Sequence, residues 1–149
     1  MDAIVVYESV YGNTREVAEA IAEGVGATAV LPVREAQGRR GTVDLLIVGG
    51  PTHVHGMATK RSRHAGAETA REDRRSHLDP GATAEPGLRT CLHDLSPAAA
   101  LGIDVIATES FLVQDTEGPL KAGELERAWA WGAEVARSLP APTKQLVGT

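Results

Sequence analysis

The chain lacks several sequence features that mark particular classes of protein, such as disulfide-rich, membrane and secreted proteins. Its 149 residues include one cysteine, Cys91, so no intramolecular disulfide can form. No apolar run approaches the roughly 20 residues that a membrane helix needs, and the first residues show no signal-peptide pattern. We therefore expect a cytoplasmic protein that has no membrane among its partners.

Positive charge and aromatic side chains are also scarce. The chain carries 15 Lys and Arg against 20 Asp and Glu, a net charge of −5, which argues against binding to nucleic acid. Aromatic residues make up 3%, so the core must be built from Val, Ile, Leu and Ala. The length suits one domain, which we assign to residues 1–139, with residues 140–149 as a flexible tail.

Four segments are predicted to be strands. Residues 3–7 (AIVVY) and 43–50 (VDLLIVGG) are apolar almost throughout, as in strands that are buried on both faces of a parallel sheet. We expect the second of these to be central in the sheet. Residues 28–33 form a shorter strand, which Pro32 places at an edge. Residues 102–113 contain the fourth.

Helical patterns alternate with these strands. Asn13 opens a helix, with Glu16 as its partner in a capping box. Another helix begins near Gly123, and its apolar face is predicted to include Trp129 but not Trp131. The alternation predicts an α/β fold, an open parallel sheet of four clear strands with helices on both faces.

The stretch between residues 59 and 102 gives weaker signals. Part of 65–77 is predicted to be a solvated helix, and residues 87–95 have helical spacing that makes Cys91 a buried structural thiol rather than a redox centre. The basic residues of this stretch alternate with acidic ones, and we favour a solvated surface over a partner-docking role for them: Lys60, Arg61, Arg63, Arg71, Arg74 and Arg75.

The first loop, residues 8–14, follows a strand at the edge where such sheets bind ligands. Ser9 and Thr14 offer hydroxyl groups, and Gly12 allows a close approach of the backbone. The free N–H groups and the positive dipole end of the next helix begin at Asn13. Such a turn binds phosphate, and we favour this role over a simple helix cap. The loop has no Walker A lysine, which argues against ATP or GTP hydrolysis.

Three segments resemble the flavodoxin-like family. Residues 9–14 (SVYGNT) resemble its phosphate loop, residues 48–57 (VGGPTHVHGM) are similar to its second loop, and residues 109–132 resemble the closing segment of short members common in high-GC bacteria. The resemblance implies a flavodoxin-like sheet and FMN as cofactor. It implies phosphate contacts from Ser9, Val10, Tyr11, Gly12, Asn13 and Thr14, and ring contacts from Pro51, Thr52, His53 and Gly56.

Two other motifs are not assigned a functional role. The pair His53 and His55 has no further ligands at a suitable spacing, so we assign no metal. Residues 115–119 (DTEGP) are explained better as a turn than as a catalytic loop. No side chain is assigned as catalytic, since flavin chemistry belongs to the cofactor.

The chain departs from the family in its middle. Family members have five parallel strands, but residues 51–102 contain no apolar β run, as if one strand–loop–helix unit were deleted. That loop would form one wall of the flavin site. Two hypotheses stay open. One is an FMN protein in electron transfer or reduction, with a redox partner protein or a small-molecule acceptor. The other is a binding or regulatory module that has lost the ring site. A truncated and marginally stable paralogue, which follows from the same gap, and a homodimer that supplies the wall also stay open.

Overall fold

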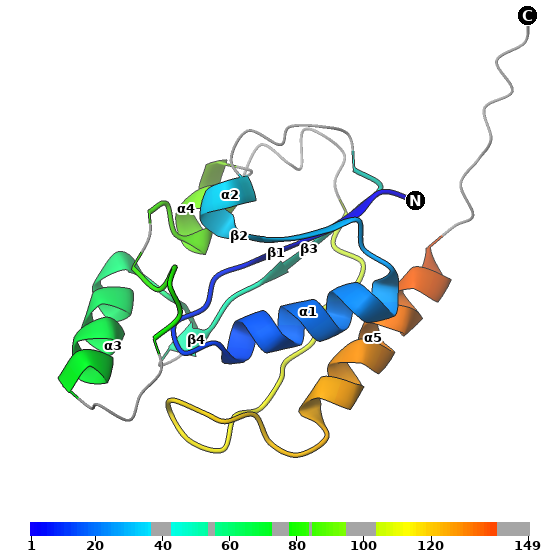
Figure 1. Cartoon of the computed structure of the whole chain (residues 1–149). Helices are drawn as coiled ribbons and strands as arrows, with labels where there is room; N and C mark the ends of the chain where they lie inside the picture. Colours follow the sequence, from blue (N-terminus) through cyan, green and yellow to red (C-terminus); the bar gives the residue numbers. More distant parts are fainter. Residues whose placement is uncertain (37–42, 54–55, 73–77, 84, 95–103, 140–149) are drawn as a thin grey trace, which may run out of the picture.

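Three parallel strands form the centre of the molecule (Figure 1). The computed structural model describes residues 1–36, 43–53, 56–72, 78–83, 85–94 and 104–139. The strands are β1 (Ala3–Tyr7), β2 (Ala29–Pro32) and β3 (Leu45–Gly49), in the order β2-β1-β3. The edge position of Pro32 is confirmed, whereas the prediction that the third strand is central is wrong. No described residue extends the sheet beyond β3, so β1 is the central strand.

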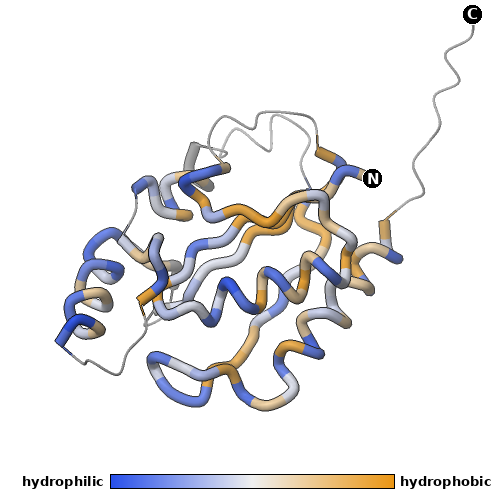
Figure 2. The backbone as a smooth tube through the Cα atoms, viewed as in Figure 1, coloured by the Kyte–Doolittle hydropathy of each residue, from blue (hydrophilic) through white to orange (hydrophobic). Residues whose placement is uncertain are grey.

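Helices cover both faces of this sheet, as predicted. They are α1 (Asn13–Val25), α2 (Val33–Ala36), α3 (Lys60–Glu72), α4 (Leu88–Asp94) and α5 (Glu124–Ser138). β1 alternates its side chains between two apolar clusters: Ala3 and Val5 pack with α1 and α5, while Ile4 and Val6 pack with residues of α2 and α4. Figure 2 shows the apolar residues concentrated on the strands and on the inner sides of α1 and α5. Cys91 of α4 is half-buried against the second cluster.

The helices α1 and α5 touch through their backbones. A Cβ atom at Gly24 would lie 2.0 Å from the carbonyl oxygen of Trp129, and one at Gly132 would lie 2.4 Å from that of Ile21. Because the backbone of α5 lies directly on α1 here, the Trp129 side chain projects sideways and is 47% exposed. Trp131 instead packs on the core, edge-on to Phe111. The sequence pattern placed Trp129 on the apolar face of the helix and Trp131 off it, and the structure shows the reverse.

The predicted fourth strand is not formed in its described part. Residues 104–112 have no strand conformation, and Val113 makes only an isolated bridge with Leu120. Val105 is 84% exposed and Ile106 is 55% exposed. A strand needs a neighbour to satisfy its backbone groups, and within the described residues none lies between β3 and this segment. The parallel sheet therefore has three strands rather than four. Residues 102–103 of the predicted strand and residues 140–149 of the predicted tail lie outside the described residues.

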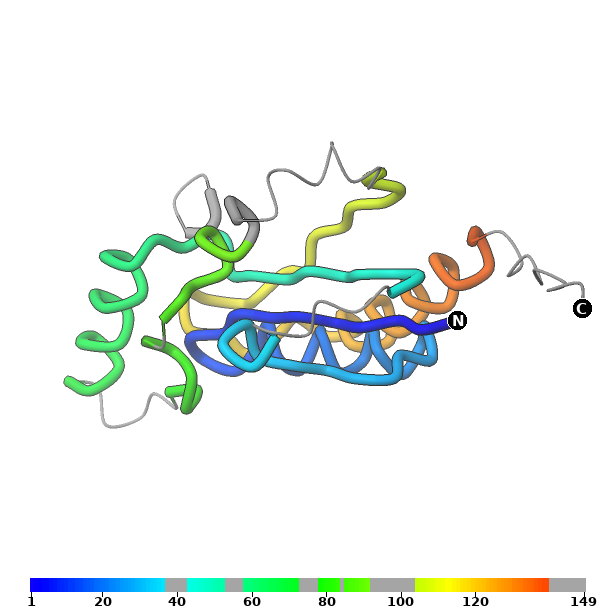
Figure 3. The backbone as a smooth tube through the Cα atoms, turned by 90° about the horizontal axis from the view of Figure 1, so that it is seen from above, coloured from blue at the N-terminus to red at the C-terminus, as the bar shows by residue number. Residues whose placement is uncertain are grey.

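The helix α3 lies beyond the carboxyl ends of the strands (Figures 1 and 3). It is largely hydrophilic (Figure 2), yet it buries Arg63, Ala67 and Ala70. Near it, β4 (Thr52–His53) and β5 (Gly56–Met57) form a short antiparallel pair. α3 therefore covers the edge of the sheet at which ligands usually bind. None of the helices in the described ranges has the length and apolar character needed to span a bilayer.

Candidate functional site

The two loops predicted to bind a ligand meet at the carboxyl edge of the sheet. The Glu8 N–H donates to the Gly49 carbonyl oxygen at 2.9 Å, which holds the end of β1 beside the end of β3. The methyl carbon of Thr14 lies 3.8 Å from where a Cβ of Gly49 would stand. Pro51 lies two residues after Gly49, and Thr52, His53 and Gly56 lie in the β4–β5 pair. The two predicted loops therefore lie side by side, and their role in binding stays a prediction.

The first loop is closed by its own hydrogen bonds. Gly12 is the N-cap of α1, with φ 93°, a left-handed conformation that suits glycine. Its N–H donates to the Ser9 hydroxyl at 3.0 Å, and its carbonyl accepts from the N–H of Glu16 at 3.0 Å. The predicted capping box is therefore wrong, because a cap without a side chain cannot form one.

Other side chains of this loop hold neighbouring segments. Val10 is 2% exposed and belongs to the interior. The Tyr11 hydroxyl donates to the Gly66 carbonyl of α3 at 3.2 Å, and the Asn13 side-chain amide donates to the Glu117 carbonyl at 3.0 Å. That amide carries a second N–H, so Asn13 retains a donor. The loop therefore anchors both α3 and the turn at residues 115–118.

The first turn of α1 keeps free donors. Within the described parts of the chain, no acceptor lies within hydrogen-bonding reach of the N–H groups of Asn13, Thr14 and Arg15. These are the donors that every helix leaves unpaired at its start, and the helix dipole adds positive potential there. These N–H groups and the guanidinium of Arg15 are the donors that this turn could offer to an anion.

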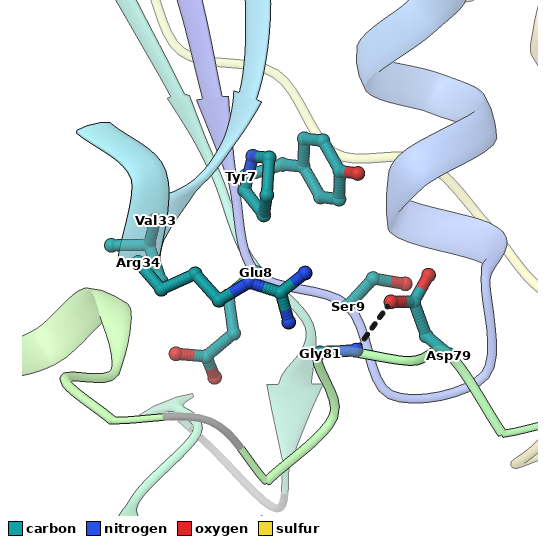
Figure 4. Close-up of a pocket in the computed structure, with 8 residues that line it drawn as sticks. Tyr7, Glu8, Ser9, Val33, Arg34, Asp79 and Gly81 are labelled. Carbon is teal, nitrogen blue, oxygen red and sulfur yellow. Dashed lines mark hydrogen bonds between the residues drawn. The ribbon is translucent and has the colours of Figure 1, made fainter.

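Asp79 lies against this turn and was not singled out from the sequence. Its N–H donates to the Val10 carbonyl at 2.8 Å, and its carboxylate lies 3.2 Å from Arg15 Nη1. Oδ1 accepts from the N–H of Gly81 at 3.1 Å, while the buried Oδ2 has no hydrogen bond. Figure 4 shows the carboxylate beside the Ser9 hydroxyl. The Asp-Pro-Gly sequence was the available signal, because Asp favours such turns.

A small cavity separates Asp79 from the ends of β1 and β2. Its volume is about 10 Å³, and its lining includes Tyr7, Glu8, Ser9, Arg34 and Asp79 (Figure 4). That is room for about one water molecule. The edge of the sheet beside the first loop is thus filled largely by the protein itself.

A buried ion pair fastens α3 to the end of β1. Glu8 and Arg63 have side chains that are 4% and 3% exposed, and their charged groups lie 3.4 Å apart. Glu8 also accepts from the N–H of Leu88 at 2.5 Å, and Arg63 reaches Glu85 at 2.7 Å. The interpretation of Arg63 as part of a solvated surface is therefore wrong. Its spacing to the buried Ala67 was the signal that it faces inward.

Two tyrosines near the loop remain protonated. Burial, assisted by the nearby Asp79 carboxylate, raises the pKa of the Tyr7 phenol above its usual value of 10.0. Burial also raises the pKa of the Tyr11 phenol, with a further contribution from Glu117. Both hydroxyls are therefore neutral hydrogen-bond donors at physiological pH.

The described site offers N–H groups and the Arg15 guanidinium, which are donors suited to an anion. No group of three or more His, Cys, Asp or Glu side chains in the described ranges could hold a metal ion. A comparison with protein-family models and a comparison with curated proteins each find no match for the chain. The structure shows an α/β domain with a three-stranded parallel open sheet, and helices pack against it.

Proposed function

We propose that this chain is a flavodoxin-like protein that binds FMN through its phosphate at the first turn of α1. The observation that carries the proposal is the set of N–H groups on Asn13, Thr14 and Arg15, which have no acceptor among the described residues and lie at the carboxyl end of the central strand. A phosphate at this position would accept these hydrogen bonds and would pair with the Arg15 guanidinium.

The residues fit the two ends of FMN unequally. The phosphate end is supported by amides, a guanidinium and the Thr14 hydroxyl, all at one helix start. The ring end would lie toward Pro51 and Thr52, which follow β3. The cavity beside the loop holds only about 10 Å³, so the isoalloxazine ring must lie outside it. When bound, FMN supplies one- or two-electron chemistry, and these residues bind and orient it.

A second candidate function is favoured by how the sheet edge is covered. Asp79 stands beside the anion-binding turn, and α3 is fastened over the strand ends by Arg63. This arrangement suits a flavodoxin-fold binding or regulatory module that takes a small phosphorylated ligand and no flavin ring. Because fold alone does not decide function, the ligand must be identified directly.

The test is a titration that separates the phosphate from the ring. We expect FMN to bind with quenching of its fluorescence, and riboflavin, which has no phosphate, to bind at least about 100-fold more weakly, since each charge-assisted hydrogen bond contributes about 1.5–3 kcal/mol. Inorganic phosphate should compete with FMN. Binding of inorganic phosphate without any binding of FMN would replace the first candidate with the second.

A variant that adds a negative charge to the first turn of α1 tests the proposed position of the phosphate. Thr14→Glu puts a carboxylate at the start of α1, where the helix dipole tolerates it, so the fold should keep its stability while phosphate is repelled. Thr69→Glu adds the same charge on the exposed side of α3 and is the control. Equal FMN affinity in the two variants would refute the assigned position of the phosphate.

A further inference from the structure

On the outer surface, where α1 and α5 pack against each other, lies a groove that is separate from the candidate ligand site. Its volume is about 480 Å³, and Ala20, Leu125 and Trp129 provide its apolar surface. Leu125 is 40% exposed and Trp129 is 47% exposed. The two helices lie side by side over this length (Figure 1). An exposed tryptophan beside an exposed leucine is typical of a surface that a partner covers.

Acidic side chains surround this apolar surface. Glu16, Glu19 and Glu23 follow one side of α1 over about 10 Å, and Glu126 comes from α5. Among the described residues no cation pairs with Glu16, Glu23 or Glu126, and Glu19 meets only Arg15 at 3.9 Å. Arg15 lies closer to Asp79, at 3.2 Å. The groove therefore carries uncompensated negative charge, and no basic side chain lines it.

We propose that this groove docks a basic amphipathic helix of a partner protein. Large apolar side chains of that helix would pack on Leu125 and Trp129, and its Lys or Arg side chains would face the glutamates of α1. Charge complementarity selects a basic occupant, and the exposed indole selects one with large apolar side chains. The proposal does not depend on FMN, because none of the residues assigned to the phosphate lines the groove.

A second copy of this chain fits the groove less well. The most basic helix that the structure describes is α3, with exposed Lys60, Arg61 and Arg71. Its only apolar residues are alanines and one glycine, so it has no large side chain to cover Trp129. The occupant is therefore a different protein.

The experiment uses the full chain with Trp131→Phe, which leaves Trp129 as the single tryptophan. The probe is a synthetic amphipathic helix of leucine and lysine, compared with the same helix carrying glutamate in place of lysine. We expect the lysine helix to shift Trp129 emission to shorter wavelength, because the indole becomes buried, and binding should weaken with added salt. The glutamate helix should produce no shift.

Matched charge variants locate the binding surface. Glu16→Gln, Glu19→Gln and Glu23→Gln together remove three charges from the groove and should weaken the lysine helix about tenfold, given the modest energy of each exposed ion pair. Glu68→Gln, Glu72→Gln and Asp104→Asn together remove three charges from exposed positions elsewhere and should change binding less than about twofold. Equal loss in both sets, no emission shift, or concentration-dependent self-association that buries Trp129 would each overturn the proposal.

Discussion

The buried pair of Glu8 and Arg63 allows the sharpest test of how the site is held. In Glu8→Ala the Arg63 guanidinium keeps only its contact with Glu85, and the N–H of Leu88 loses its acceptor. Arg63 cannot move easily to water, since it is 2% exposed and lies where a Cβ of Gly87 would be. Removing one partner of a buried ion pair costs about 3–5 kcal/mol. That is a large part of the roughly 5–15 kcal/mol that stabilises a typical domain.

Urea unfolding followed by circular dichroism measures this cost. Glu8→Gln keeps an acceptor for Leu88 and should lose less, about 1–3 kcal/mol. The double variant Glu8→Leu with Arg63→Met replaces the pair by apolar groups, and it should be more stable than Glu8→Ala alone. A loss below about 1 kcal/mol for Glu8→Ala, or a double variant whose loss equals the sum of the single losses, would refute the coupling.

Three further predictions concern packing, ligand competition and acid stability. Gly132→Ala should destabilise the fold by about 1–3 kcal/mol in urea unfolding, because its Cβ would meet a backbone oxygen of α1 at 2.4 Å, whereas Gly66→Ala, whose nearest contact is a hydroxyl at 3.3 Å, should be tolerated. If FMN binds as proposed, Asp79→Asn should tighten it about tenfold in the fluorescence titration, because a competing negative charge is removed; unchanged affinity would count against this. The hydrogen bond from Arg127 lowers the pKa of Glu124 from 4.5, so its contribution to stability is present above pH 4.5 and is lost as the pH falls below it. Glu124→Gln should flatten the acid side of a plot of melting temperature against pH.

Local patterns in the sequence predicted the elements that depend on local signals. The β-branched run at Ala3–Tyr7 and the helical spacing after Asn13 each indicated one structure, and both form as expected. Pro32 was correctly placed at an edge because its missing N–H has the same consequence in any sheet. The candidate loop was found for a similar reason, since a strand followed by glycine and a helix start is a local pattern.

Features set by distant contacts were not predictable in this way. Trp129 is exposed because α5 packs so closely on α1 that glycines of each helix meet backbone carbonyl groups of the other. The spacing of apolar residues within α5 does not show this contact. Arg63 is buried because Glu8, 55 residues earlier, provides the opposite charge. The segment at Val105 had the composition of a strand, but a strand also needs a hydrogen-bonded neighbour, and no described strand pairs with this segment. Asp79 lies at the site because of a turn whose partners are far away in sequence.

The close crossing of α1 and α5 has a consequence for biosynthesis. The strands and α1 come from the first third of the chain, but the face that they share is completed only by Ala128 and Val135 of α5. During translation, the apolar side chains of α1 are therefore fully covered only after α5 has been synthesised. A nascent or truncated chain that ends before Glu124 would expose this face to chaperones or to aggregation. This side of the sheet therefore reaches its native packing only once α5 is available.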